Sequence, residues 1–199
     1  MIPRFVPPIG LAELAAALAS SKPDDIQRFE AAFAKTMGQK HAIAFPYGRT
    51  GLVALLRCLG LERREIICPA YTCVVVANAV VTSGNRPGFV DSGPDANARL
   101  DQVEAAIGNN SGAFIATSIF GNPVDLDALD QIARRHPGLP IIQDCAHSFI
   151  CEWNGRPVHR QGIAAIFGLN VSKTMTSIFG GMVTTDDDRL AEADRKSVV

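Results

Sequence analysis

Short β-strand patterns alternate with helical patterns along most of this chain, and that alternation restricts its fold more than any other feature. Strands are predicted where short apolar runs lie between turn residues, and helices where apolar residues recur at helical spacing. Because helices and short connections separate consecutive strands, the strands pair in parallel through helical crossovers. The sequence therefore predicts a three-layer α/β/α domain with a mostly parallel sheet and helices on both faces.

The predicted elements follow one another closely. The segment 5–10 is expected to be extended because it contains Pro7 and Pro8. Strands are predicted at 41–45, 65–68, 86–90, 113–118 and 140–143, in the apolar run that begins at Ala164, and after the glycine turn at 180–181. Helices are predicted at 11–20, from 23–25 to Gly38, and at 52–59, 72–83, 101–107 and 124–136.

Charge and cysteine content limit the class of partner. The 199 residues carry a net charge of −1, which gives no electrostatic reason to expect nucleic acid or an anionic membrane as a partner. The five cysteines are odd in number and form no C-x-x-C pair, so we expect reduced thiols and no metal site. No signal peptide pattern and no apolar run of about 18 residues is present. A soluble, cytoplasmic protein is therefore expected.

Three predicted turns carry polar or charged residues directly after a strand. The turn 48–51 (Gly-Arg-Thr-Gly) opens a helix, and backbone amides at a helix N-terminus can hold a phosphate. Its spacing matches neither the dinucleotide-binding nor the P-loop pattern. Asp144 directly follows the strand at 140–143, and Lys173 follows a later apolar run. Because ligands bind outside the carboxyl ends of parallel strands, the three turns are expected at one edge of the sheet.

Each of these three signals also has a purely structural interpretation: a simple chain reversal, a helix cap at Asp144 and a solvated loop lysine. Taken together, they match what pyridoxal phosphate requires. The helix start would hold the phosphate, the acid would keep the pyridine nitrogen protonated, and the amine would condense with the aldehyde. A lysine that leaves a buried strand loses hydration, which lowers its pKa from about 10.4 and makes the free amine available.

Several segments resemble the motifs of one known family. Segment 48–60 is similar to G-T-A-A-L-x-x-A-L-x-x-L-G, and 167–173 is similar to F-S-F-x-x-[ST]-K. The others are 67–73 (I-x-P-x-x-T-F), Asn78-Ala79, 118–125 (H-x-Y-G-x-P-x-D), 143–147 (E-D-A-A-[QH]) and 180–182. From Val6 to Thr185 the chain thus resembles the DegT/DnrJ/EryC1/StrS sugar aminotransferases, which have the aspartate-aminotransferase-like fold type I.

The resemblance implies specific roles at the site. Asp144 would pair with the pyridine nitrogen of pyridoxal phosphate, and His147 would lie near the phenolate oxygen of the ring. Lys173 would bind the cofactor covalently and later move a proton, as the catalytic residue. The amides of Arg49 and Thr50 would hold the phosphate. The full set of cofactor-binding residues expected from the resemblance is Gly48, Arg49, Thr50, Tyr71, Cys73, Asp144, His147, Asn170, Ser172 and Lys173.

At two positions this chain departs from the family pattern. Cys73 stands where the family has an aromatic residue that stacks on the ring, so either Tyr71 takes that role or the stacking is weaker. Gly168 stands where the family has a serine that binds the phosphate, so that donor is lost unless Ser172 or a partner subunit replaces it. Both departures predict altered cofactor affinity.

Family members continue well beyond the lysine into a smaller domain, whereas this chain stops at Val199. The expected organisation is an N-terminal extended segment and helix in residues 1–30 and an incomplete cofactor-binding large domain in 31–199, with the C-terminal small domain missing. Without that domain, recognition of the amino donor and closure of the site would be impaired, and the fragment alone would be weakly active or inactive.

The resemblance implies a pyridoxal-phosphate-dependent aminotransferase of cell-surface polysaccharide or amino-sugar biosynthesis. Its amine would come from an amino acid such as glutamate and go to a keto sugar, which is expected to be nucleotide-linked, and the enzyme would be a homodimer. Two alternatives stay open. A cofactor-dependent sugar dehydratase of the same scaffold has histidine at the lysine position, so Lys173 argues against it. A non-catalytic remnant of the family is favoured mildly by Cys73 and Gly168.

Overall fold

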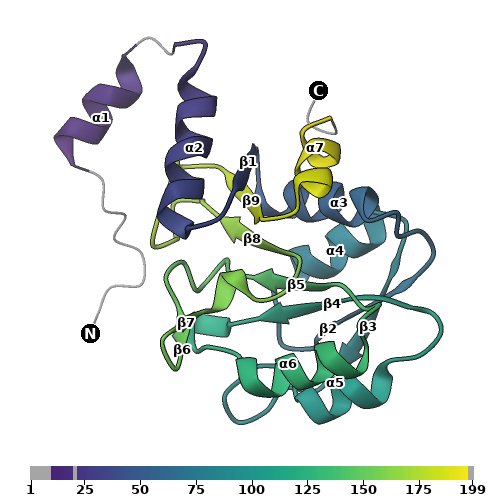
Figure 1. The fold of residues 1–199 in the computed structure, drawn as a ribbon. Helices are drawn as coiled ribbons and strands as arrows, with labels where there is room; N and C mark the ends of the chain where they lie inside the picture. The colour runs from purple at the N-terminus through teal and green to yellow at the C-terminus, as the bar shows by residue number, and fades with distance from the viewer. Residues whose placement is uncertain (1–9, 20–21, 197–199) are drawn as a thin grey trace.

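A seven-stranded sheet forms the centre of the molecule, with helices on both sides (Figure 1). The computed structural model describes residues 10–19 and 22–196, so nearly all of the predicted extended segment 5–10 lies outside the described residues. The central strand pairs are parallel, and only β9 runs antiparallel to both of its neighbours. The spatial order is β1 (His41–Phe45), β9 (Gly181–Thr185), β8 (Ala164–Gly168), β5 (Ile141–Asp144), β4 (Ser111–Thr117), β2 (Glu65–Pro69) and β3 (Arg86–Val90).

Successive side chains of the central strands point into two separate hydrophobic clusters, as the alternation of a β-strand requires. In β4, Phe114 and Ala116 join one cluster, whereas Ala113 and Ile115 join the other. The predicted mostly parallel sheet with helices on both faces is therefore confirmed. The first cluster is covered by α2 (Asp25–Met37), α5 (Leu100–Ala106) and α6 (Leu126–Arg135), and the second by α3 (Gly48–Cys58), α4 (Val74–Thr82) and α7 (Asp188–Lys196).

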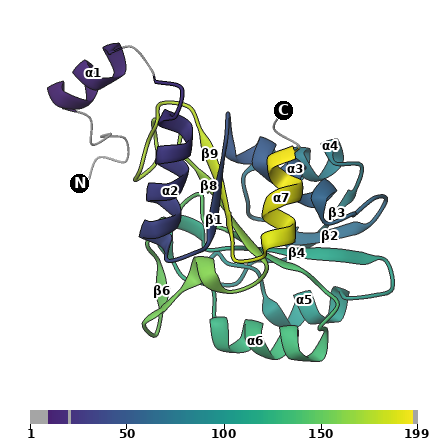
Figure 2. The ribbon, with the colours of Figure 1, turned by 45° about the horizontal axis from the view of Figure 1, so that its top comes forward.

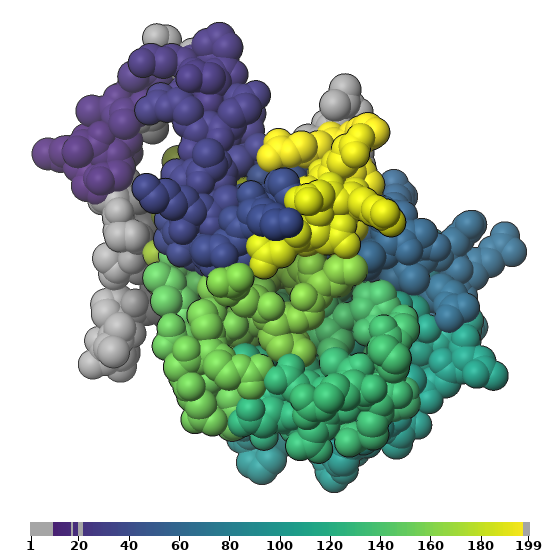
Figure 3. All heavy atoms as spheres, viewed as in Figure 1, coloured from purple at the N-terminus to yellow at the C-terminus, as the bar shows by residue number. Residues whose placement is uncertain are grey.

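The first helices differ in how they meet the sheet. In Figure 2, α2 and α7 lie on either side of β1, and both contact that strand. Helix α1 (Leu11–Leu18) projects at the margin of the molecule in Figure 3, and Leu11 and Leu18 are exposed. The predicted division between residues 1–30 and 31–199 falls inside α2 and stays a prediction.

Helix α3 begins four residues earlier than predicted, at Gly48 instead of Leu52. The reason is local: the Thr50 hydroxyl donates to the Tyr47 carbonyl at 2.6 Å and accepts from the Tyr47 amide at 3.2 Å. Thr50 thereby closes the first helical turn. The turn 48–51 is thus the first turn of the helix, and Gly48 lies close to the end of β8.

Some elements were not predicted. Helix α7 begins after Asp187, whose carboxylate accepts from the amides of Arg189 and Leu190. A small hairpin joins β6 (Glu152–Trp153) to β7 (Arg156–Pro157) through Asn154-Gly155, a dipeptide that favours this tight turn. Both features have sequence signals, an N-capping aspartate and an Asn-Gly pair. Two short helical turns, η1 (Ile119–Gly121) and η2 (Val158–Arg160), complete the fold.

We predict that Gly181→Ala destabilises the protein because β9 begins against the backbone of α3. A methyl group at position 181 would lie 2.2 Å from the Gly48 nitrogen and 2.4 Å from the Tyr47 carbonyl carbon. The expected loss is about 1–3 kcal/mol of unfolding free energy, measured by urea denaturation. Gly108→Ala is the matched control, since nothing lies within 4 Å of the added methyl group. Equal stability of the two variants would contradict this close approach.

A second prediction concerns Asp194, which is 1% exposed on α7. Burial raises the pKa of Asp194, and this effect exceeds the lowering caused by the hydrogen bond from Cys58 and by the positive charge of Arg195. The resulting pKa is about 7. Between about pH 4 and pH 7 the folded state therefore keeps a proton on Asp194 that the unfolded state has released. The free energy of unfolding consequently falls as pH rises through that window, by up to about 1.4 kcal/mol per pH unit. Asp194→Asn should lack this slope, so the stability difference between the wild type and the variant, measured by urea titration, should change with pH between about pH 4 and pH 7. Parallel curves for both proteins would refute it.

Candidate active site

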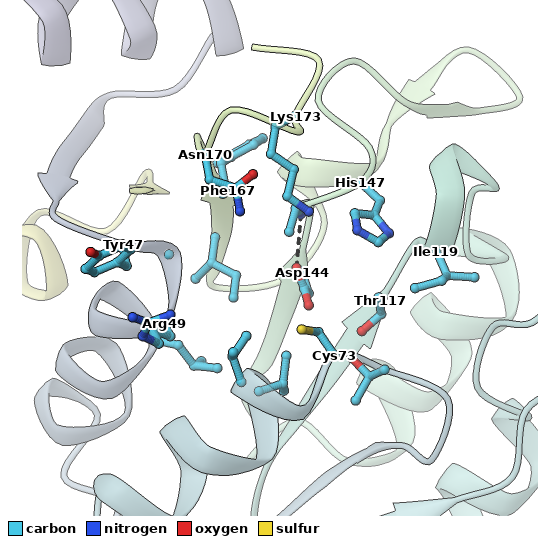
Figure 4. A pocket seen from close by; sticks show the side chains of 18 of the residues that line it. Tyr47, Arg49, Cys73, Thr117, Ile119, Asp144, His147, Phe167, Asn170 and Lys173 are labelled. Atoms are coloured by element: carbon cyan, nitrogen blue, oxygen red, sulfur yellow. Dashed lines mark hydrogen bonds between the residues drawn. The ribbon is translucent and has the colours of Figure 1, made fainter. Parts of the chain in front are cut away.

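One pocket lies at the carboxyl ends of β4, β5 and β8, between the first turns of α3 and α4 (Figure 4). This is where a mostly parallel sheet places its ligand. Most of the wall is apolar, and its polar groups come from five separate segments of the chain. The lining residues are Tyr47, Gly48, Arg49, Leu52, Thr72, Cys73, Val75, Val76, Thr117, Ile119, Asp144, Ala146, His147, Ile166, Phe167, Gly168, Asn170, Lys173 and Gly180.

Asp144 is the last residue of β5, and its side chain is buried in the pocket. Burial raises the pKa of Asp144, while a hydrogen bond from the Ala146 amide (3.0 Å) and the positive charge of Lys173 act in the opposite direction. A carboxylate in such a place is costly unless a cation and hydrogen bonds compensate for the lost water. The site is therefore built to receive positive charge beside Asp144.

Lys173 reaches the pocket from the loop between β8 and β9. In Figure 4 its ammonium group points at the Asp144 carboxylate. The loop is braced locally, because the Asn170 side-chain oxygen accepts from both the amide (3.1 Å) and the hydroxyl (2.7 Å) of Ser172. The amide of Lys173 donates to the Asn170 carbonyl at 3.0 Å. These bonds fix the direction in which the lysine leaves the loop.

The first turn of α3 forms another wall of the pocket. At Gly48, a Cβ atom would lie 3.0 Å from the carbonyl oxygen of Phe167, so glycine lets the helix start approach the end of β8. The guanidinium of Arg49 lies over the Tyr47 ring, 4.1 Å from its centroid, a favourable cation–π arrangement. First-turn amides and a cation together suit an anion at this end of the pocket.

His147 lines the pocket opposite this helix, and Phe120 lies against it. The two rings are stacked at 14° with centroids 5.6 Å apart. Tyr71 meets the same Phe120 ring edge-on, with centroids 6.1 Å apart. The pocket margin on this side is thus formed by three aromatic rings in contact.

The structure brings most of the predicted cofactor-binding residues together, and three fall outside the lining. Thr50 is engaged within its own helical turn, and its amide also donates to the Tyr47 carbonyl at 3.1 Å. Tyr71 is half-exposed beside Phe120, and the Ser172 hydroxyl bonds Asn170. The predicted residues that do line the pocket are Gly48, Arg49, Cys73, Asp144, His147, Asn170 and Lys173.

Thr117 is a polar lining residue that the sequence did not reveal. It ends β4 directly beside Asp144 in the parallel register, and it is 5% exposed. Its hydroxyl has no hydrogen-bond partner within the described part of the chain, so it is available to a ligand. An isolated threonine at the end of an apolar strand carries no sequence signal, because threonine is common in strands for steric reasons.

Within residues 10–19 and 22–196, no group of three or more histidine, cysteine, aspartate or glutamate residues could hold a metal ion. Across the same described ranges, no helix combines the length and apolar character needed to span a membrane.

The chain belongs to the DegT/DnrJ/EryC1/StrS aminotransferase family, whose sequence profile matches residues 11–197. Among solved structures, it is similar to DesV of S. venezuelae in complex with a ketimine intermediate, with 31% identity and a TM-score of 0.82 over 92% of this chain and 50% of that one. It is also similar to DesI in the presence of its TDP-sugar product, with 32% identity and a TM-score of 0.82 over 92% of this chain and 47% of that one.

A third neighbour shares the fold at lower identity. GDP-4-keto-6-deoxymannose-3-dehydratase with a trapped PLP-glutamate geminal diamine is 21% identical, with a TM-score of 0.87 over 97% of this chain and 53% of that one. The chain therefore spans about half the length of the structures it matches. The fold agrees with the one that the family resemblance implied.

We predict that Cys73 is the first thiol to react with an alkylating reagent. It is exposed and lines the pocket, whereas Cys68, Cys145 and Cys151 are buried. Burial raises the pKa of Cys68 to about 12 and also raises the pKa values of Cys145 and Cys151, which removes the reactive thiolate. Mass spectrometry during iodoacetamide treatment should show a single fast addition that Cys73→Ser abolishes. A fast addition at Cys68, Cys145 or Cys151 would contradict the burial of these thiols.

Proposed function

We propose that this chain is the cofactor-binding part of a pyridoxal-phosphate-dependent aminotransferase. The observation that carries the proposal is the placement of Lys173 and Asp144 in one pocket with the first turn of α3. The lysine faces the buried carboxylate, and the helix start forms a third wall. These groups come from segments well separated in the sequence, so their convergence is a property of the fold. Family membership supports the same conclusion.

The residues present fit the cofactor. Asp144 is a buried carboxylate that needs a cationic partner once Lys173 moves away, and the protonated ring nitrogen of pyridoxal phosphate is such a group. Gly48 permits close approach at the helix start, and Arg49 adds positive charge there. When bound, the cofactor supplies an aldehyde that a lysine can attach and a ring that withdraws electrons from the substrate.

Each of the chain's own groups has a defined task in this proposal. Lys173 holds the cofactor and afterwards carries a proton as a free amine, which requires that it be close to the reacting carbon. Asp144 keeps the ring nitrogen protonated. His147 presents its imidazole to the ring near the phenolate oxygen. Cys73 and Ala146 belong to the apolar walls, whereas Tyr71, the residue expected to replace the stacking aromatic, lies outside the lining.

We further propose that the acceptor is a keto sugar linked to a nucleotide and that an amino acid such as glutamate supplies the amine. Support comes from DesI, which was solved with a TDP-sugar product, at 32% identity. The complete active site would be built in a homodimer of the cytoplasmic protein. Lys173 separates this proposal from a sugar dehydratase, since that sister class has histidine there. A non-catalytic remnant is distinguished by the experiment below.

We predict covalent attachment of pyridoxal phosphate to one lysine. The purified chain is incubated with the cofactor, reduced with borohydride and analysed by peptide mass spectrometry. One cofactor should be found on Lys173 and none after Lys173→Ala, because among the lysines that the structure describes Lys173 is the one that lines the pocket beside Asp144. Lys35→Ala, at an exposed position on α2, is the control and should label like the wild type.

A second readout does not depend on the covalent bond. Pyridoxal phosphate that fills the pocket should slow the alkylation of Cys73 in the wild type. If neither labelling at Lys173 nor protection of Cys73 occurs at cofactor concentrations in large excess, the chain is a remnant that does not bind the cofactor. Labelling at other lysines to the same extent would contradict the assigned role of Lys173.

A further inference from the structure

Phe120 has a backbone conformation that a bulky residue rarely adopts. Its φ and ψ are 54° and 20°, in the left-handed region, and Gly121 follows with φ of 80°. Glycine adopts such angles freely, whereas a side chain with a Cβ atom is strained there. Strain of this kind persists where the surroundings impose it, and it is concentrated at functional sites.

The surroundings do impose it, because buried Asn97 ties both ends of the turn. The Ile119 amide donates to the Asn97 side-chain oxygen at 3.0 Å, and the Asn97 amide group donates to the Asn122 carbonyl at 3.1 Å. Asn97 is 1% exposed, so these bonds are shielded from water. The turn 119–122 is therefore held in place on either side of Phe120.

The strained turn presents the Phe120 ring to His147 and does not bury it. The ring is 57% exposed, so hydrophobic burial offsets little of the strain. Its contacts include the parallel stack on His147 and the edge of Tyr71. Ring stacking restricts the plane of an imidazole, and an imidazole acts on a ligand through nitrogens that lie in that plane.

We propose that Phe120 is a positioning residue for His147, held in a strained turn so that its ring sets the plane of the imidazole in the active-site pocket. This inference depends on the proposed function in one respect, namely that the ligand near His147 is pyridoxal phosphate. The stack and the strain are properties of the free protein.

The first test is made without cofactor. The chain has four histidines, so their ring protons can be followed by NMR, with His147→Gln to assign the relevant signal. Phe120→Gly should move the His147 signals downfield to random-coil positions, because the ring current of Phe120 is lost, and Phe120→Tyr should restore them. Phe89→Ala is the control: Phe89 on β3 is 56% exposed, lies outside the pocket lining, and should leave the signals unchanged.

The second test separates strain from ordinary packing. Phe120→Gly and Phe120→Ala both remove the ring, but only glycine relieves the left-handed backbone. Phe120→Gly should therefore be the more stable variant, by roughly 5- to 30-fold in the unfolding equilibrium constant. Size-exclusion chromatography should show the same assembly state for both. Equal stabilities, or dissociation of one variant, would overturn the claim that the strain serves His147.

The third test uses pyridoxal phosphate and equilibrium titration. Phe120→Gly should weaken cofactor binding roughly 3- to 10-fold, while Phe120→Tyr binds like the wild type. An unchanged affinity in Phe120→Gly, together with unshifted His147 signals, would overturn the positioning role. Failure of the wild type to bind the cofactor would instead count against the proposed function, and the NMR and stability results would still decide whether Phe120 positions His147.

Discussion

A buried carboxylate at the end of β5 is the constraint on which the rest of the site depends. Asp144 loses its water when the sheet forms, and burial makes its charged form unfavourable. Two groups compensate for this loss. The Ala146 amide donates a hydrogen bond to the carboxylate, and the loop between β8 and β9 directs the ammonium group of Lys173 at it. A ligand that replaces the lysine charge with its own would relieve the same cost, and this is why we propose a ligand with a cationic ring.

The antiparallel strand β9 is what returns the chain to this site. It inserts between β1 and β8, and its first residue, Gly181, lies against the start of α3 with no room for a side chain. The helix start, the lysine loop and the end of β8 are therefore locked to one another by backbone contact. Close-packed backbone transmits position more reliably than flexible side chains do.

The aromatic groups of the site lie at its margin. Cys73 and aliphatic residues form the wall near Asp144, whereas Tyr71 and Phe120 extend outward from His147. Phe120 thus makes its aromatic contact with His147. Because Cys73 and Gly168 depart from the family pattern, the proposed cofactor would have fewer side-chain contacts to its ring and its phosphate. In the function that we propose, the helix start and Arg49 would carry more of the anion binding, and the strained turn at Phe120 would orient His147.

The sequence by itself determined the order of strands and helices, the parallel pairing and the three chemically distinct turns, because apolar periodicity and glycine placement are local properties. It also carried signals for the Asn154-Gly155 hairpin and the α7 cap. It could not show that Tyr71 lies outside the pocket lining, that Thr117 belongs to it, or that Phe120 stacks on His147. Those relations join residues distant in the chain, and only the packing of the sheet edge, the helix start and the loops decided which side chains share one cavity.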